Sequence, residues 1–246
     1  MQNLLSLQNK QFLVTGASSG MGKVFAQMIA SQGGIVTLLA RSEERLRETL
    51  CSMEGNNHKI KVCDLMDEFQ LKKVVDEVDS LDGIVLCAGI NEFVPVKFIK
   101  QEKIDKMFQT NYFSQLILVQ LLLKKKLVNK GASIVFISSI SSILGVPGTL
   151  LYASSKASVN AAVRVLASEL AGQMIRVNAI CPGIVKTEML NGTNIETDIF
   201  MNQEEKYPLG LGSPEDVGNC VLFLLSRASR WLTGQCIVID GGFTLN

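Results

Sequence analysis

Tyr152 and Lys156 stand four positions apart in the segment Tyr-Ala-Ser-Ser-Lys. Residues at this spacing share one face of a helix, so the phenol and the ammonium can meet there. A phenol with a pKa of about 10 exchanges protons poorly at neutral pH, and a neighbouring ammonium favours the phenolate and lowers that pKa. The pair therefore indicates a proton donor, although by itself the same spacing is also typical of an ordinary, partly exposed helix face.

A glycine-rich turn follows the first apolar run and reads Thr-Gly-Ala-Ser-Ser-Gly-Met-Gly. In such a turn Gly16 permits the tight bend, Gly20 lets the backbone approach a pyrophosphate, and Gly22 lets the helix pack on the sheet. Free amides at the helix start, with the hydroxyls of Ser18 and Ser19, suit a bound phosphate. The turn indicates a dinucleotide site, and a flexible connection between a strand and a helix is the alternative.

The composition excludes several other kinds of chemistry. His58 is the only histidine and lies in a polar segment typical of a loop, so a Ser-His-Asp hydrolase lacks its general base. The six cysteines show no Cys-x-x-Cys spacing, which argues against a metal site and favours free thiols in a reducing compartment. The 24 basic and 23 acidic residues give a net charge of +1, which provides no charge excess for nucleic acid or an anionic membrane.

No part of the sequence is typical of a membrane or secretory segment. The most apolar stretch, 116–123, is interrupted by Gln120 and followed by lysines, and it is too short to span a bilayer. The first ten residues lack the basic and then apolar pattern of a signal peptide. We therefore expect a cytoplasmic protein.

Short apolar runs alternate with amphipathic stretches along the whole chain. The runs predict strands at 11–14, 35–40, 59–63, 83–87, 132–138, 175–180 and 235–239. Between them, helices are expected at 20–32, from Ser42 onward, and at 67–78, 105–125, 152–171 and 214–225. Continuously apolar strands separated by helices indicate a parallel sheet covered on both faces. Seven strands, with the glycine turn after the first, favour a doubly wound sheet over a closed eight-stranded barrel.

Several motifs, in this order along the chain, resemble those of the short-chain dehydrogenase/reductase family. The glycine turn is similar to the family pattern TGxxxGxG, and Tyr152 with Lys156 to its YxxxK. Ser139 and Asn111 stand where the family places a catalytic serine and a helix asparagine. Further matches are Pro182-Gly183 with Thr187, Pro208-Leu209-Gly210, Pro214-Glu215-Asp216-Val217, Thr233-Gly234-Gln235 and Asp240-Gly241-Gly242, the later ones resembling the 3-oxoacyl-[acyl-carrier-protein] reductase branch.

The resemblance implies a single α/β domain over 1–246, with a Rossmann-type, doubly wound, seven-stranded parallel sheet and helices on both faces. It implies the reduction of a ketone to a secondary alcohol, with Tyr152 as the proton donor, Ser139 bonded to the substrate oxygen and Lys156 on the nicotinamide ribose. Asn111 is implied in a water-linked proton relay behind Lys156. The cofactor-binding residues implied are Gly16, Ser18, Ser19, Gly20, Met21, Arg41, Asp64, Leu65, Cys87, Ala88, Gly89, Tyr152, Lys156, Pro182, Gly183, Ile184 and Thr187.

The end of the second predicted strand favours NADP(H) as the cofactor. An acidic residue there would bind an adenosine ribose and repel a 2′-phosphate, but this chain has Ala40. Arg41 follows it and can pair with the phosphate through its guanidinium. NAD(H) remains the alternative, because Ser19 stands where NADPH-dependent members often carry a basic residue.

One motif departs from the family. The fourth strand usually ends in Asn-Asn-Ala-Gly, whereas this chain has Leu86-Cys87-Ala88-Gly89. Cys87 keeps the backbone but lacks the amide side chain, so we expect a small change in stability and no loss of activity.

The polar segment 188–206 predicts a lid loop over the substrate site, with an idle surface insertion as the alternative. The resemblance implies a 3-oxoacyl thioester substrate and an acyl-carrier protein as a partner, for which Lys126 and Lys130 could form part of a basic rim. Acyl-carrier proteins are acidic, so the acidic residues of the segment do not favour that partner. Another small or hydrophobic ketone is therefore an alternative substrate.

The apolar stretch 105–125 indicates self-association, because it carries more apolar surface than packing against one face of the sheet would bury. We expect a homotetramer formed through this helix and the Tyr152 helix. A nucleotide-binding regulatory protein without turnover is the alternative to an enzyme, and the complete set of Asn111, Ser139, Tyr152 and Lys156 favours the enzyme.

Overall fold

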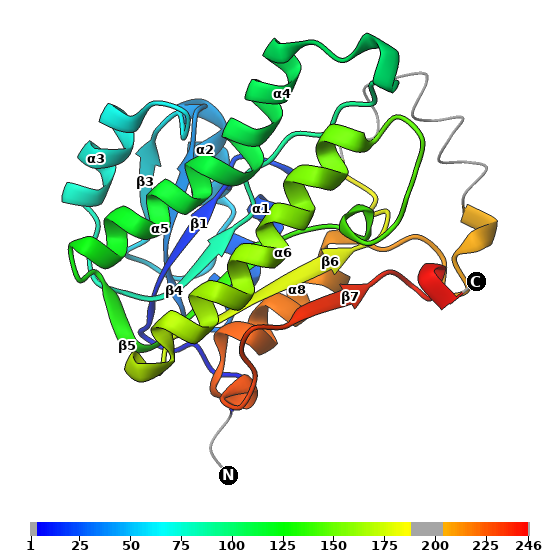
Figure 1. Ribbon diagram of the computed structural model, residues 1–246. Helices are drawn as coiled ribbons and strands as arrows, with labels where there is room; N and C mark the ends of the chain where they lie inside the picture. Colours follow the sequence, from blue (N-terminus) through cyan, green and yellow to red (C-terminus); the bar gives the residue numbers. More distant parts are fainter. Residues whose placement is uncertain (1–3, 188–203, 246) are drawn as a thin grey trace.

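The computed structural model describes residues 4–187 and 204–245, and a parallel sheet forms its centre (Figure 1). The strands run in the order β3-β2-β1-β4-β5-β6-β7, and every pairing is parallel. Their bounds are β1 Gln11–Thr15, β2 Ile35–Ala40, β3 Lys59–Val62, β4 Leu81–Leu86, β5 Val128–Ile137, β6 Arg176–Pro182 and β7 Cys236–Ile239. The predicted seven-stranded, doubly wound sheet is confirmed, and its winding reverses between β1 and β4.

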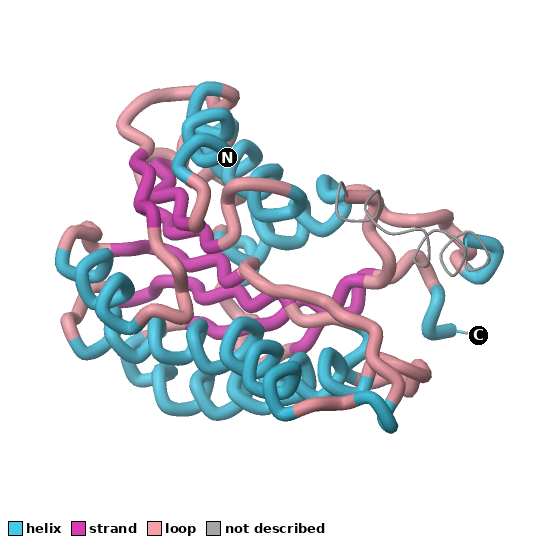
Figure 2. Tube along the Cα trace, turned by 90° about the horizontal axis from the view of Figure 1, so that it is seen from above, coloured by secondary structure: helices cyan, strands magenta, loops and turns pink. Residues whose placement is uncertain are grey.

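Helices cover both faces of the sheet, as the view from above shows (Figure 2). One face packs against α1 (Gly20–Ser31), α2 (Glu43–Cys51) and α8 (Pro214–Leu225). The other packs against α3 (Glu68–Asp76), α5 (Ser114–Lys124) and α6 (Leu150–Leu170). The central strands β1, β2, β4 and β6 and most of β5 are buried between these layers, which explains why their sequences are largely apolar, whereas the edge strands β3 and β7 are partly exposed.

Three of these helices have a side-chain cap at their N-terminus, at positions where the sequence changes from apolar to polar. Ser42 accepts a hydrogen bond from the Arg45 amide at the start of α2, and Asp67 accepts bonds from two amides of α3. Ser213 and Asp216 form a reciprocal capping box at α8. Such caps satisfy amides that have no partner inside the helix.

The prediction of a single continuous helix at 105–125 is wrong in detail. The helix begins earlier, as α4 (Gln101–Phe108), and passes through a π-helical turn, Gln109–Phe113, before α5. In this turn the amide of Ser114 donates to the carbonyl of Gln109, five residues back. Turns of this kind are frequent at functional sites.

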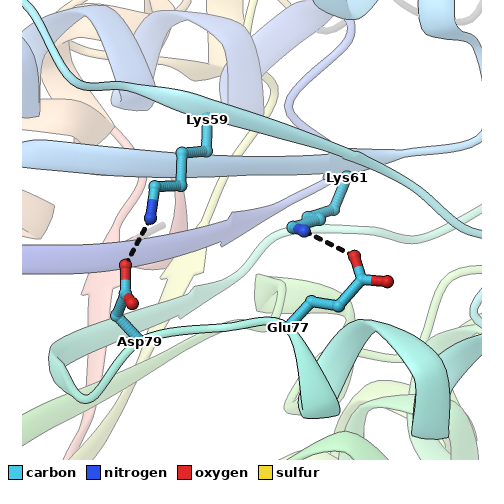
Figure 3. Close-up of polar contacts among 4 residues, drawn as sticks. All are labelled: Lys59, Lys61, Glu77 and Asp79. Carbon is cyan, nitrogen blue, oxygen red and sulfur yellow. Dashed lines mark hydrogen bonds and ion pairs between the residues drawn. The ribbon is translucent and has the colours of Figure 1, made fainter.

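Ion pairs tie the edge strand β3 to the segment that follows α3 (Figure 3). Lys59 Nζ lies 2.5 Å from Asp79 Oδ2, and Lys61 Nζ lies 2.6 Å from Glu77 Oε2. The bond from Lys61 lowers the pKa of the Glu77 carboxyl. Charged side chains on an edge strand oppose pairing with another sheet.

The remaining predictions about the chain have mixed outcomes. All six cysteines are free thiols. No helix in the described part of the chain is long and apolar enough to cross a membrane. The predicted lid, 188–206, lies outside the described residues except for a 3₁₀ turn, Glu204–Lys206.

Candidate active site

The glycine turn joins β1 to α1 beside the end of β4. Gly16 has a φ of +69°, and a Cβ atom there would lie 3.0 Å from the backbone of Ala88. Only glycine fits this close approach of two chain segments. Ser19 precedes α1 and makes no side-chain capping bond, so its hydroxyl does not compete for the amides of the first turn.

A groove of about 750 Å³ opens over this turn, at the carboxyl ends of β1, β2, β3 and β4. This is the point where the winding of the sheet reverses, where open α/β sheets bind their ligands. The predicted cofactor residues that line it are Gly16, Ser18, Ser19, Gly20, Met21, Arg41, Asp64, Leu65, Cys87, Ala88, Gly89 and Thr187. A cradle of glycines, hydroxyls and helix amides with this volume fits a dinucleotide.

Basic side chains line the end of the groove next to β2. Arg41 and Arg45 both face the groove there, and Ala40 leaves the position free of a carboxylate. Sequence reasoning missed Arg45, although its place three residues after the cap Ser42 puts it on the first turn of α2. The charge at this end suits a phosphate monoester.

Two polar side chains clamp the end of β4 from opposite sides. The Thr15 hydroxyl accepts hydrogen bonds from the amides of Cys87 and Ala88, at 3.0 and 3.1 Å. The Gln115 side chain donates to the carbonyl of Ala88 at 2.6 Å from α5. Gln115 is fully buried, and its Oε1 has no hydrogen-bond partner among the described residues. A buried amide with an unpaired oxygen lowers stability, while the bond that it donates to Ala88 holds the turn after β4 in place.

The predicted catalytic side chains meet at the carboxyl end of β5. Lys156 is 4% exposed, and its Nζ donates to the carbonyl of Ile137 at 2.8 Å and lies 5.8 Å from the centroid of the Tyr152 ring. The Ser139 hydroxyl hydrogen-bonds Tyr152 and accepts a bond from the Ser141 amide at 3.1 Å. A hydroxyl donor, a phenol and an ammonium therefore share one small region.

Asn111 lies in the π-helical turn and is fully buried. Its side chain accepts from the Ile90 amide at 2.8 Å and donates to the Ile90 carbonyl at 2.9 Å, and it also donates to Ser155. A Cβ atom on Gly89 would lie 3.2 Å from Asn111 Oδ1 and 3.5 Å from Lys156 Nζ. Gly89 therefore links the groove to the catalytic side chains, because it lines the former and touches two of the latter.

The expected lowering of the Tyr152 pKa is wrong for this structure. Burial raises the pKa of Tyr152, and the hydrogen bond from Ser139 opposes this only in part. Burial also lowers the pKa of Lys156 to about 8, because the interior disfavours an ammonium. The phenol therefore stays protonated at neutral pH, which is the form that a proton donor needs.

Five predicted cofactor residues are not among those that line the groove, namely Tyr152 and Lys156 of the catalytic group and Pro182, Gly183 and Ile184 after it in the chain. Pro182 ends β6, the Gly183 amide donates to the Ile239 carbonyl at 2.9 Å, and the Ile184 amide donates to the Tyr207 hydroxyl at 3.0 Å. The structure thus commits the Ile184 amide to a bond within the protein.

Two expectations about lysines and cysteines can also be placed. Lys130 lies near the start of β5, and Lys126 precedes that strand. Both therefore lie toward the amino-terminal ends of the strands, on the opposite side of the sheet from the site. The predicted basic rim at the pocket is therefore wrong, because the site lies at the carboxyl ends of the strands. Burial raises the pKa of the Cys87 thiol to about 12, so that sulfur stays protonated and is poorly reactive.

The chain is similar to known proteins over nearly its whole length. Residues 16–244 match the family model described as Enoyl-(Acyl carrier protein) reductase. A 3-oxoacyl-[acyl-carrier-protein] reductase of Rickettsia felis is 34% identical over 98% of this chain and all of its own length. Carbonyl reductase family member 4 of Danio rerio is 32% identical over 95% of this chain and 97% of its own. A short-chain type dehydrogenase/reductase from Mycobacterium marinum has a similar structure, with a TM-score of 0.90, 31% identity and 99% of each chain covered.

Proposed function

We propose a specific reaction for this chain. The chain belongs to the short-chain dehydrogenase/reductase family and is an NAD(P)-dependent oxidoreductase that is similar to 3-oxoacyl-[acyl-carrier-protein] reductases. The proposed reaction is the NADPH-dependent reduction of a ketone to a secondary alcohol. The observation that carries the proposal is the meeting of Tyr152, Ser139 and Lys156 beside Gly89, where the groove ends.

In the proposed mechanism the phenol of Tyr152 gives its proton to the oxygen of the substrate carbonyl. Bound NADPH supplies the hydride. The Ser139 hydroxyl donates to the same oxygen and stabilises the negative charge that develops on it. Lys156, held by the carbonyl of Ile137, then stabilises the phenolate left on Tyr152, so that loss of the proton is less costly. Asn111 holds the backbone at Ile90 and places the π-helical turn behind Lys156, where we propose the water-linked relay that returns a proton.

The preference for NADPH rests on the groove at the end of β2. Arg41 and Arg45 line this end, and Ala40 removes the carboxylate that would bind a ribose 2′-hydroxyl. Asp64 and Leu65, after β3, line the same groove and would contact the adenine.

We propose a 3-oxoacyl thioester as the substrate, on the strength of relatives such as the Rickettsia felis and Thermotoga maritima 3-oxoacyl-[acyl-carrier-protein] reductases, which are each 34% identical. An acyl-carrier protein is then the expected carrier of that thioester. The alternative, another small or hydrophobic ketone, is supported by the similarity to carbonyl reductase family member 4. Turnover of acetoacetyl thioester compared with a panel of simple ketones separates the two.

We also propose a homotetramer. Phe113, at the end of the π-helical turn, is 46% exposed, and Val165 on α6 is 57% exposed. Apolar side chains on two neighbouring helices of one face favour association with a second copy. Light scattering that finds a monomer would exclude this assembly.

Tyr152→Phe tests the proposed role of the phenol. The substitution removes one hydroxyl, and we expect turnover of acetoacetyl thioester to fall by a factor of about 10² to 10⁴, the usual contribution of a general acid. The fold and the affinity for NADPH should be retained, which circular dichroism and cofactor fluorescence would show. Turnover near that of the wild type with any carbonyl substrate would refute the role.

A further inference from the structure

The face of α6 that carries Tyr152 and Lys156 continues one turn further to Asn160. The three residues are four positions apart in succession, so they lie in one row along the helix. Asn160 is 7% exposed, and its side chain points to the segment after β5. A buried amide beside a catalytic pair needs partners, and those partners show what it does.

Asn160 reaches the catalytic serine through one intermediate residue. Its Nδ2 donates to the Ser142 hydroxyl at 2.7 Å, and that hydroxyl donates to the main-chain carbonyl of Ser139 at 2.6 Å. The amide oxygen of Asn160 accepts from the Cys181 thiol at 3.9 Å, at the end of β6. The amide therefore uses both its donor and its acceptor and holds a fixed orientation.

The segment 138–142, which contains Ser139 and the 3₁₀ turn Ile140–Ser142, is hydrogen-bonded to α6 on both sides of Ser139. On the earlier side, the Ser138 hydroxyl donates to the carbonyl of Lys156 at 3.2 Å. On the later side, Ser142 is bound to Asn160. These attachments lie one helical turn apart on α6, so they fix the position of Ser139 relative to Tyr152.

We propose that Asn160 is a positioning residue that acts through Ser142 to hold the Ser139 hydroxyl against Tyr152. The inference rests on the proposed function and adds to it, because it names the side chains that keep the hydroxyl and the phenol in register. Directional bonds suit this purpose better than apolar packing, because they fix both distance and orientation, and an error of about 1 Å in such a site can cost two orders of magnitude in rate.

The test compares Asn160→Leu and Ser142→Ala with their double variant. We expect kcat for acetoacetyl thioester to fall about ten-fold in each single variant. The double variant should lose no more than either single one, because both substitutions break the same chain of bonds. Affinity for NADPH should stay within about two-fold of the wild type, since neither side chain lines the groove.

A second readout separates positioning from a general loss of structure. The bond from Ser139 lowers the pKa of Tyr152, so weakening it should move the Tyr152 limb of the kcat pH profile to higher pH. Ser142→Thr keeps the hydroxyl and should restore kcat. Ser158→Ala is the matched control, because within the described part of the chain the Ser158 hydroxyl bonds only to the carbonyl of Ser154 in α6.

The outcomes are distinguishable. Wild-type kcat and an unchanged pH profile in both single variants, or additive losses in the double variant, would overturn the positioning role. If Asn160→Leu fails to fold, Ser142→Ala decides, because it removes only a half-buried hydroxyl. Retained turnover in Tyr152→Phe would instead overturn the proposed function itself.

Discussion

Lys156 should lower the stability of the protein at neutral pH while serving its reaction. Its pKa falls from an ordinary 10.5 to about 8, because the folded protein buries the ammonium. The unfolded chain therefore binds the proton more tightly, and the shift corresponds to about 3 kcal/mol of destabilisation at pH 7. This cost is complete below pH 8 and fades as the pH rises toward the unfolded value, so about 1 kcal/mol remains at pH 10.

Lys156→Met removes the charge and keeps a side chain of similar length. The variant also loses the bond to the Ile137 carbonyl, worth about 1 kcal/mol. We expect its free energy of unfolding to exceed that of the wild type by about 2 kcal/mol at pH 7 and to equal it at pH 10, while turnover is lost.

Urea unfolding at both pH values, at one protein concentration, measures this difference. Groups that do not interact with Lys156 titrate alike in the two proteins, so the change with pH reports the buried ammonium together with its interactions with the Cys87 and Cys181 thiols. Lys130→Met is the control, because this lysine is exposed and its loss should alter stability equally at both pH values. A gain that does not depend on pH, or a loss at pH 7, would refute the reasoning.

Three further substitutions test other parts of the structure. Arg41→Ala should raise the KM for NADPH by about ten-fold or more and leave that for NADH unchanged, whereas Arg47→Ala, on the outer face of α2, should change neither. Gln115→Leu removes the bond to Ala88 together with an unpaired oxygen, so unfolding stability should stay within about 1 kcal/mol while fluorescence titration shows weaker NADPH binding. Ser213→Ala breaks the capping box of α8 and should lower the free energy of unfolding by about 1 kcal/mol in urea titrations.

The number of strands, their parallel arrangement and the place of the glycine turn could be predicted, because they follow from the pattern of apolar runs along the chain. Apolar runs separated by amphipathic stretches indicate a parallel sheet wherever they occur, and the turn lies where the first of them ends. The π-helical turn could not be predicted in this way. It accompanies bonds between Asn111 and Ile90, which are 21 positions apart, and no pattern within the helix shows such a contact.

The predicted direction of the Tyr152 pKa shift is wrong for a related reason. Spacing shows that Tyr152 and Lys156 share a helix face, but only the tertiary structure shows that the face is buried. Burial acts on each group separately and outweighs their attraction. Asn160 escaped notice because a helix asparagine is usually a solvent-exposed residue, and Ser142, its partner, is 18 positions away.

The two edge strands of the sheet, β3 and β7, differ in the charge of their exposed side chains. This difference determines at which edge a strand from another molecule could pair. On β3, paired lysines discourage an incoming strand. The four residues of β7 carry no charge, and Val238 is 38% exposed there. Fibrillar growth of a partly unfolded population should therefore start from β7, and Val238→Lys should slow it.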